Sequence, residues 1–175
     1  MSRKWGFRLV AIVIVFGVLI AVWTRRSRSV IQPYRNSEAV TEKFARGLPE
    51  SSAVKKIVIE GSTGPNQLVR AVRSSQTAPL ATQIAVWLKS GVLVHLNVPG
   101  HQVGTGRYAV QLVLRSHRAV TISPAVSSID PNGARTRPIR NVVVYEMSTG
   151  RTVYLRDAPI YHWLVERKWR ADLRH

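Results

Sequence analysis

Histidine and acidic side chains are the groups in this sequence that could bind a metal or transfer a proton. No two of the five histidines are three or four residues apart, the spacing that places two ligands on one helix face. These histidines are His95, His101, His117, His162 and His175. We therefore predict that the chain binds no metal ion.

Motifs for covalent catalysis and phosphate binding are also missing from the sequence. The chain has no cysteine, no G-x-S-x-G sequence, no H-E-x-x-H sequence and no Walker sequence. Its three aspartates, Asp130, Asp157 and Asp172, fit turns and helix ends. We expect a protein that is not an enzyme and needs no cofactor. A tethered enzyme whose site is assembled only by folding is the third hypothesis for its function.

Arginine and lysine give the strongest chemical signal. The sequence has 26 of them against nine acidic residues, and its net charge is +17. Six flank an N-terminal apolar run, so 20 basic residues face nine acidic ones in the rest of the chain. Because the planar guanidinium group pairs with carboxylates and phosphates, this excess favours an anionic partner. The alternative is a charge that only keeps the protein soluble, or an arginine-rich codon usage.

Eight basic residues are candidate contacts to an anionic partner. They are Arg135, Arg137 and Arg140 on an extended arm, Arg151 and Arg156 around a hairpin strand, and Arg167, Lys168 and Arg170 in the last helix. Aromatic residues such as Tyr154 and Trp169 lie between them, and aromatic rings can stack on bases. Membrane-tethered, nonspecific and salt-dependent nucleic-acid binding is therefore the second hypothesis.

Residues 7–23 form an almost unbroken apolar run. With its flanks it spans residues 5–24, close to the ~20 residues that a helix needs to cross a bilayer. Tryptophan at both ends and a snorkelling arginine fit the headgroup regions. A buried core helix and a cleaved signal peptide are the alternatives, but the residues after the run are bulky and charged, which argues against cleavage. The predicted anchor residues are Trp5, Phe7, Arg8 and Trp23.

The chain thus divides into four predicted segments. Residues 1–4 are a short basic tail, 5–24 a transmembrane helix, 25–36 a basic juxtamembrane linker and 37–175 one α+β domain. A short basic tail before an uncleaved anchor favours a cytoplasmic N-terminus. We expect a single-pass protein of the bacterial inner membrane with its C-terminal domain outside the cytoplasm, or a protein of a virion membrane.

A helix, a strand and a second helix are predicted at the start of this domain. Ser37 begins a helix whose apolar stripe packs on the domain or, as the lesser alternative, binds a partner. Residues 55–60 are a strand, 61–65 a turn and 66–75 a helix. The start of that second helix could hold an anion on free backbone N–H groups, although an ordinary turn is the favoured interpretation. Residues 82–90 fit either a strand or a helix.

Alternating apolar residues predict strands in the rest of the domain. We expect residues 92–98 and 107–115 to pair in antiparallel fashion, with 119–123 as a third strand and 124–140 as an irregular connection. The clearest hairpin follows, with strands 141–147 and 151–156. Asp157 then caps a helix over 158–173 whose basic last turns pack on the domain or face a membrane surface or an anionic partner.

The predicted fold class is α+β: a single N-terminal transmembrane helix, then one domain with a curved antiparallel sheet of about five or six strands and flanking helices. This plan resembles the bitopic assembly subunits of type IV secretion systems. The leading hypothesis is a non-catalytic, membrane-anchored scaffold or accessory subunit of a secretion or DNA-transfer machine, or of a membrane-containing virion. Its expected partners are a lipid bilayer, other protein subunits, and anionic lipid or nucleic acid, and oligomers are allowed.

Overall fold

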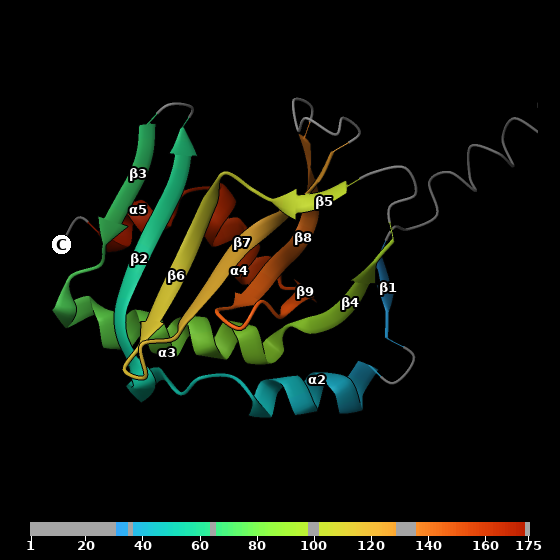
Figure 1. Cartoon of the computed structure of the whole chain (residues 1–175), viewed down its shortest axis with the longest axis horizontal. Helices are drawn as coiled ribbons and strands as arrows, with labels where there is room; N and C mark the ends of the chain where they lie inside the picture. Colours follow the sequence, from blue (N-terminus) through green and yellow to red (C-terminus); the bar gives the residue numbers. More distant parts are fainter. Residues whose placement is uncertain (1–30, 35–36, 64–65, 98–101, 129–135, 174–175) are drawn as a thin grey trace, which may run out of the picture. The chain divides into compact units, whose positions relative to one another are not determined.

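An antiparallel sheet of nine strands dominates the part of the chain described by the structure, which is a computed structural model (Figure 1). The described residues are 31–34, 37–63, 66–97, 102–128 and 136–173. In chain order the elements are β1 (Ile31–Pro33), α2 (Ser37–Arg46), the 3-10 turn η1 (Ser51–Ala53), β2 (Val54–Thr63), β3 (Asn66–Ala71), α3 (Ser74–Ser90), β4 (Val92–Leu96), β5 (Gln102–Thr105), β6 (Tyr108–Leu114), β7 (Ala119–Ser128), β8 (Thr136–Met147), β9 (Thr152–Arg156), α4 (Ala158–Val165) and α5 (Trp169–Asp172).

The strand order differs from the chain order. Along the sheet it is β1-β4-β9-β8-β7-β6-β2-β3, with β5 pairing to β7 off this path, and every pair is antiparallel. The two longest-paired strands, β7 and β8, lie in the middle, and β1 and β3 are the edges among the described strands. Two segments distant in sequence, β4 and β9, are therefore neighbours.

One face of the sheet is covered by helices and holds the main hydrophobic core. Ile84 and Leu88 of α3 and Leu164 of α4 are almost fully buried against strand residues such as Ile57 and Ile122. These helices lie behind the strands in the view of Figure 1. Successive strand residues point to opposite faces, so β6 is buried at every second residue. Each large aliphatic side chain buried here contributes roughly 1.5–3 kcal/mol to the free energy of unfolding.

A smaller buried cluster lies on the opposite face, where the sheet bends. The register of β7 against β8 shifts between Pro124 and Val126, and such irregularities bend and twist a strand. Beyond the shift, β7 pairs with β5 on one side and with the start of β8 on the other. The bend therefore covers part of the face that the helices leave open. This cluster consists of Val94, Ala125, Val142 and Val144.

The predicted single-pass membrane architecture is corrected. The structure is a mostly antiparallel sheet with a few helices, and none of the helices within the described ranges is long and apolar enough to cross a membrane. The longest of these, α3, has 17 residues and buries one side on the sheet. Residues 5–24, with the predicted anchor residues Trp5, Phe7, Arg8 and Trp23, lie outside the described residues. The fold class and the membrane localisation are thus not those predicted, and the function is argued without them.

The helix predicted for residues 66–75 is a strand. β3 pairs with β2 from Asn66, opposite Thr63, to Ala71, opposite Val58, and the helix begins only at Ser74. Hydrogen bonding to a neighbouring strand overrides the local helical pattern here, as tertiary context often does. The anion site considered for residues 61–65 loses its basis, because no helix starts there.

The pairing predicted between residues 92–98 and 107–115 is also wrong. β4 pairs with β1 and β9, whereas β6 pairs with β2 and β7. Much of the connection predicted over 124–140 is strand, since β7 continues to Ser128 and β8 begins at Thr136. The strands β1, β3 and β5 were not predicted. With them, the described sheet has nine strands instead of five or six.

Several local predictions are confirmed. The helix from Ser37, the strand over 55–60 and the β8–β9 hairpin are all present. Residues 82–90, which fit either a strand or a helix by sequence, belong to α3. The C-terminal helix is split into α4 and α5, and its predicted cap is in place, since the Ile160 backbone N–H donates to Asp157 Oδ1 at 3.1 Å. Asp157 is 2 % exposed, and burial raises the pKa of its carboxyl group to about 6.

Replacement of Asp157 by asparagine should remove a pH dependence of stability. A carboxyl group with a folded-state pKa near 6 and an ordinary pKa of 3.8 binds its proton more tightly in the folded protein. The free energy of unfolding should therefore fall as the pH rises from about 4 to about 6, by up to about 3 kcal/mol, and then level off. Asparagine keeps the cap without the charge. In urea unfolding, the free energy of unfolding of Asp157→Asn should rise relative to that of the wild type between about pH 4 and pH 6. A difference between the two proteins that does not change with pH would contradict the prediction.

Candidate anion-binding site

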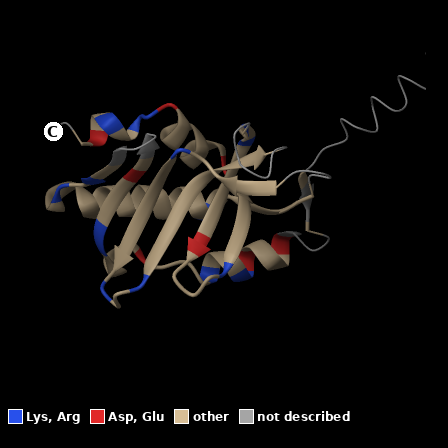
Figure 2. Cartoon of the chain, turned by 45° about the horizontal axis from the view of Figure 1, so that its top comes forward, with Lys and Arg blue, Asp and Glu red and all other residues tan. Residues whose placement is uncertain are grey.

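Four arginines gather around two aromatic rings. They lie at the end of the sheet where α5 is near β3 (Figures 1 and 2). They come from four separate parts of the chain: an edge strand, the segment before β6, the turn between α4 and α5, and α5 itself. We call this group the arginine cluster. It consists of Arg70, Arg107, Arg167 and Arg170 with the rings of Tyr108 and Trp169.

Contacts with the two rings hold three of these guanidinium groups. The Cζ atoms of Arg107 and Arg167 lie 5.6 and 5.0 Å from the centre of the Tyr108 ring. Arg170 Cζ lies 5.6 Å from the Trp169 ring, and the two rings are 5.5 Å apart. Such cation–π contacts orient a guanidinium group relative to the ring and so fix the direction in which its N–H groups point. Both rings are themselves buried, at 6 % and 1 % exposure.

A pocket of about 340 Å³ opens beside the cluster. Arg70 and Arg170 line it together with Leu68, Trp169 and Leu173. The indole Nε1 of Trp169 is buried and has no hydrogen-bond partner among the described residues. The charged side chains that line the pocket are thus two arginines, and none is a carboxylate. A ligand that fits must be an acceptor, and carboxylate or phosphate oxygens satisfy guanidinium groups best.

The sheet fixes the Tyr108 ring by close packing on a glycine. Gly61 of β2 is opposite Tyr108 of β6, and a Cβ atom at Gly61 would lie 2.7 Å from Tyr108 Cδ1. Only a residue without a side chain allows the ring to lie flat against the strand at this distance. The ring in turn contacts Arg107 and Arg167, so this glycine positions the arginine cluster indirectly.

The turn between α4 and α5 places Arg167 at an unusual backbone position. The Arg167 N–H donates to the carbonyl of Leu164 at 3.3 Å, and the Lys168 N–H to that of Trp163 at 3.1 Å. These two bonds form a Schellman motif, in which glycine usually occupies the residue found here as Arg167. Arg167 has a φ of 57°, in the left-handed region, which costs a non-glycine residue roughly 1–2 kcal/mol.

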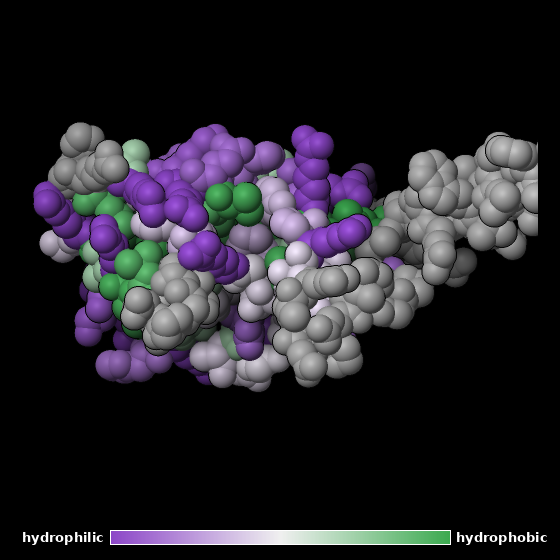
Figure 3. Space-filling model, turned by 90° about the horizontal axis from the view of Figure 1, so that it is seen from above, coloured by the Kyte–Doolittle hydropathy of each residue, from purple (hydrophilic) through white to green (hydrophobic). Residues whose placement is uncertain are grey.

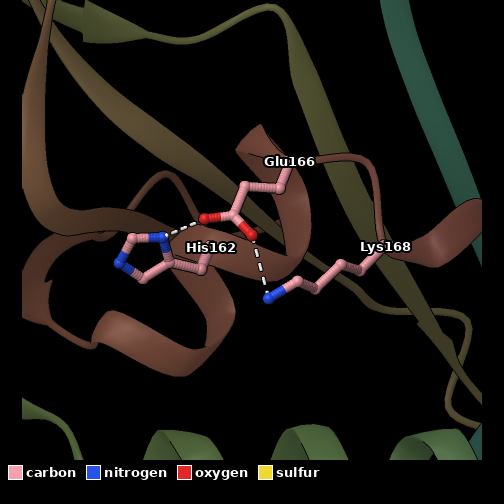
Figure 4. Close-up of polar contacts among 3 residues, drawn as sticks. All are labelled: His162, Glu166 and Lys168. Atoms are coloured by element: carbon pink, nitrogen blue, oxygen red, sulfur yellow. Dashed lines mark hydrogen bonds and ion pairs between the residues drawn. The ribbon is translucent and has the colours of Figure 1, made fainter.

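Lys168, by contrast, has an acidic partner on the same helical segment. Its Nζ lies 2.8 Å from Glu166 Oε2, while Glu166 Oε1 lies 2.6 Å from His162 Nδ1 (Figure 4). Hydrogen bonds from Lys168 and His162 lower the pKa of the Glu166 carboxyl group. The charge of Lys168 is thus largely neutralised, which leaves Arg167 and Arg170 as the cations of this turn that have no ion-pair partner among the described residues.

The structure separates the eight predicted contacts. Arg167 and Arg170 belong to the cluster, and Lys168 lies beside them in its ion pair. Arg137 and Arg140 are on the first half of β8, Arg156 ends β9, and Arg151 lines a different pocket with Lys43. Arg135 lies outside the described residues. Among those residues, no group of three or more metal-ligating side chains occurs.

Sequence reasoning missed Arg70 and Arg107 as members of the cluster. Arg70 fell in a predicted helix, and its place opposite α5 depends on the pairing of β3 with β2. Arg107 precedes Tyr108, a basic–aromatic pair that by sequence supports the nucleic-acid hypothesis but does not place Arg107 near Arg70 or α5. His162 and Glu166 are four residues apart in a predicted helix, a spacing that indicates their contact.

Comparison with known proteins adds no family to this description. No protein-family model, no curated protein and no solved structure matches the chain.

Arg167→Gly should stabilise the fold while removing a cationic group from the cluster. Glycine adopts a φ of 57° without strain, so the free energy of unfolding should rise by about 1 kcal/mol in urea unfolding. Arg167→Ala is the matched control, because it also loses the guanidinium group but keeps the backbone strain. Equal stability of the two variants would show that the backbone position carries no cost.

Gly61→Ala should destabilise the protein because it displaces the Tyr108 ring. Overpacking of this kind costs about 1–3 kcal/mol. Gly104→Ala in β5 is the control, since its Cβ atom would meet only Val126 Cγ2 at 3.8 Å, an ordinary contact. Thermal and urea unfolding of both variants test this. A loss of stability in Gly104→Ala as large as that in Gly61→Ala would contradict the assignment.

Proposed function

We propose that the protein is a non-catalytic binding subunit that attaches to an acidic surface of a protein partner through the arginine cluster. The observation that carries the proposal is the pocket of about 340 Å³ that Arg70 and Arg170 line, where their guanidinium groups offer donors to a ligand. No acidic side chain lines this pocket. A carboxylate from a partner would supply the acceptor that the site lacks.

An acidic protein surface fits this site better than a nucleic acid does. Proteins that bind single strands expose aromatic faces on which bases stack, but Tyr108 and Trp169 are buried and already covered by guanidinium groups. Of the other predicted cationic contacts, Arg137 and Arg140 are on β8 and Arg156 is on β9, whereas Arg70 of the cluster is on the edge strand β3. Nonspecific nucleic-acid binding stays the second candidate because the net charge of the chain is +17.

An exposed edge of the sheet next to the cluster supports a role in assembly. β3 is an edge strand, and it carries Arg70 of the cluster and the neighbouring Val69, which is 58 % exposed. An unpaired edge offers backbone hydrogen bonds to a partner strand. Hydrophilic side chains cover most of the described surface seen from above, with small separate apolar patches (Figure 3). Charge and edge hydrogen bonding, more than a wide apolar face, would therefore define contacts on that side.

The proposal predicts that an acidic peptide binds at the arginine cluster. A fluorescent oligoglutamate peptide of about ten residues serves as the probe, with fluorescence anisotropy measured at about 50 mM salt, where charge interactions are weakly screened. Removal of two bidentate cations in Arg167→Gln/Arg170→Gln should weaken binding at least about tenfold. Arg167→Lys/Arg170→Lys should lie between this variant and the wild type, because lysine keeps the charge but not the planar fork.

A charge-matched variant separates site binding from overall attraction. Lys56→Gln/Arg118→Gln removes the same charge near the opposite end of β6, where both side chains are exposed, and should change the affinity by less than about threefold. Equal losses in the two double variants would contradict the proposed site. Random single-stranded DNA that binds more tightly than the peptide, with equal losses in both variants, would instead establish the second candidate.

A further inference from the structure

A second pocket lies far from the arginine cluster in the strand order, between α2 and the strands β4, β8 and β9. Its volume is about 500 Å³, within the ~300–1,000 Å³ of typical small-molecule sites. Val40 and Phe44 of α2 line one side, and Leu93, Met147 and Val153 of the strands line the other. We call it the α2 pocket. Its walls are thus mainly aliphatic, with one aromatic ring.

Two cations lie at the mouth of this pocket. Lys43 of α2 and Arg151, just before β9, both line it, and both are exposed residues. Neither forms an ion pair with an acidic residue in the described part of the chain, although Arg46 on the same helix pairs with Glu42 at 3.4 Å. Two cations from separate elements, facing one apolar space, would attract an anionic group to its entrance.

One residue that lines the pocket carries a buried hydroxyl group without a partner. Tyr145 of β8 lines the pocket and is 1 % exposed, and its Oη atom has no hydrogen-bond partner among the described residues. The ring meets Phe44 edge to face, with 5.1 Å between the ring centres. Burial raises the pKa of this hydroxyl to about 12, so it stays protonated and can donate a hydrogen bond. A buried donor left unpaired is costly, and a ligand oxygen would remove that cost.

The packing of α2 explains why the space is not filled by the protein itself. The helix contacts the sheet through Phe44, and Thr41 Oγ1 accepts a bond from the Leu93 N–H at 3.4 Å. Two small residues line the pocket here, Ala39 of α2 and Gly47, which directly follows the helix. The side chain of Val40 is 36 % exposed although it belongs to the apolar stripe of the helix. Val40 thus faces a cavity, whereas Phe44 of the same helix packs against the main core.

We propose that the α2 pocket binds a small amphipathic anion: an unbranched aliphatic carboxylate that carries a second oxygen acceptor along its chain. Lys43 and Arg151 hold the carboxylate at the mouth, the aliphatic chain packs against Val40, Leu93, Met147 and Val153, and the Tyr145 hydroxyl donates to the second oxygen. This site is independent of the arginine cluster and of the function proposed for it.

Binding to the full chain is tested with three probes of similar length: monomethyl sebacate, decanoate and decanol. The first has a carboxylate and an ester oxygen, the second only the carboxylate, and the third no charge. Because the sequence has two methionines, Met1 and Met147, methyl-labelled methionine gives one NMR signal inside the pocket, assigned with Met147→Leu. Each probe is titrated, and its affinity is taken from the saturation of the Met147 shift. Monomethyl sebacate should bind most tightly, decanoate less tightly and decanol most weakly.

Two variants assign the roles of the polar groups. Lys43→Gln/Arg151→Gln should weaken both carboxylates at least about tenfold and leave decanol unchanged; both side chains are exposed, so the fold should persist. Tyr145→Phe should remove the advantage of monomethyl sebacate over decanoate, expected to be about fivefold to tenfold. The proposal is overturned if decanoate causes no saturable shift of Met147, or if decanol binds as tightly. If monomethyl sebacate still binds Tyr145→Phe more tightly than decanoate does, the proposed contact between the Tyr145 hydroxyl and the ester oxygen is refuted.

Discussion

One continuous hydrophobic core, on the face of the sheet that the helices cover, determines where everything else in this protein lies. It runs under β2, β6, β7, β8 and β9 and includes the buried rings of Trp169 and Tyr145. Both candidate sites form where this core runs out. Near β3, the core ends at the ring of Trp169, which lines the pocket of the arginine cluster. Near β4 and β9, the core ends at the ring of Tyr145, which lines the α2 pocket. Both candidate binding sites therefore lie at the edges of the same hydrophobic core.

The two borders differ in what they present. The arginine cluster consists of cations and donors around buried rings, with no acid in its pocket, which suits an acidic group carried by another molecule. The α2 pocket is mostly apolar, with two cations at its mouth and one donor within. Charge alone does not distinguish them, because both are basic. What distinguishes them is how much of each pocket is lined by aliphatic side chains and how much by arginine. This difference decides which kind of ligand each pocket could bind.

Local sequence signals predicted the elements better than their arrangement. The β8–β9 hairpin and the cap at Asp157 depend on residues a few positions apart, and both were predictable. The pairing of β4 with β9 joins segments that no turn connects, and β3 was mistaken for a helix because its partner strand decides its conformation. Arg167 and Arg170 could be selected as cations from the sequence. Their neighbour Arg70 reaches the same pocket only through the strand order, which local patterns do not contain.

The position of β4 has a consequence for biosynthesis. This strand is flanked by β1, made before it, and by β9, which is made only after β5, β6, β7 and β8. Until β9 emerges, one side of β4 has unpaired backbone groups, and Leu93 lacks the β9 residue Leu155 that will face it. The sheet cannot form strand by strand during translation, because β4 and β7 are joined only through the β8–β9 hairpin, which is made after both. Polypeptides truncated before that hairpin should therefore be prone to aggregation and to recognition by chaperones.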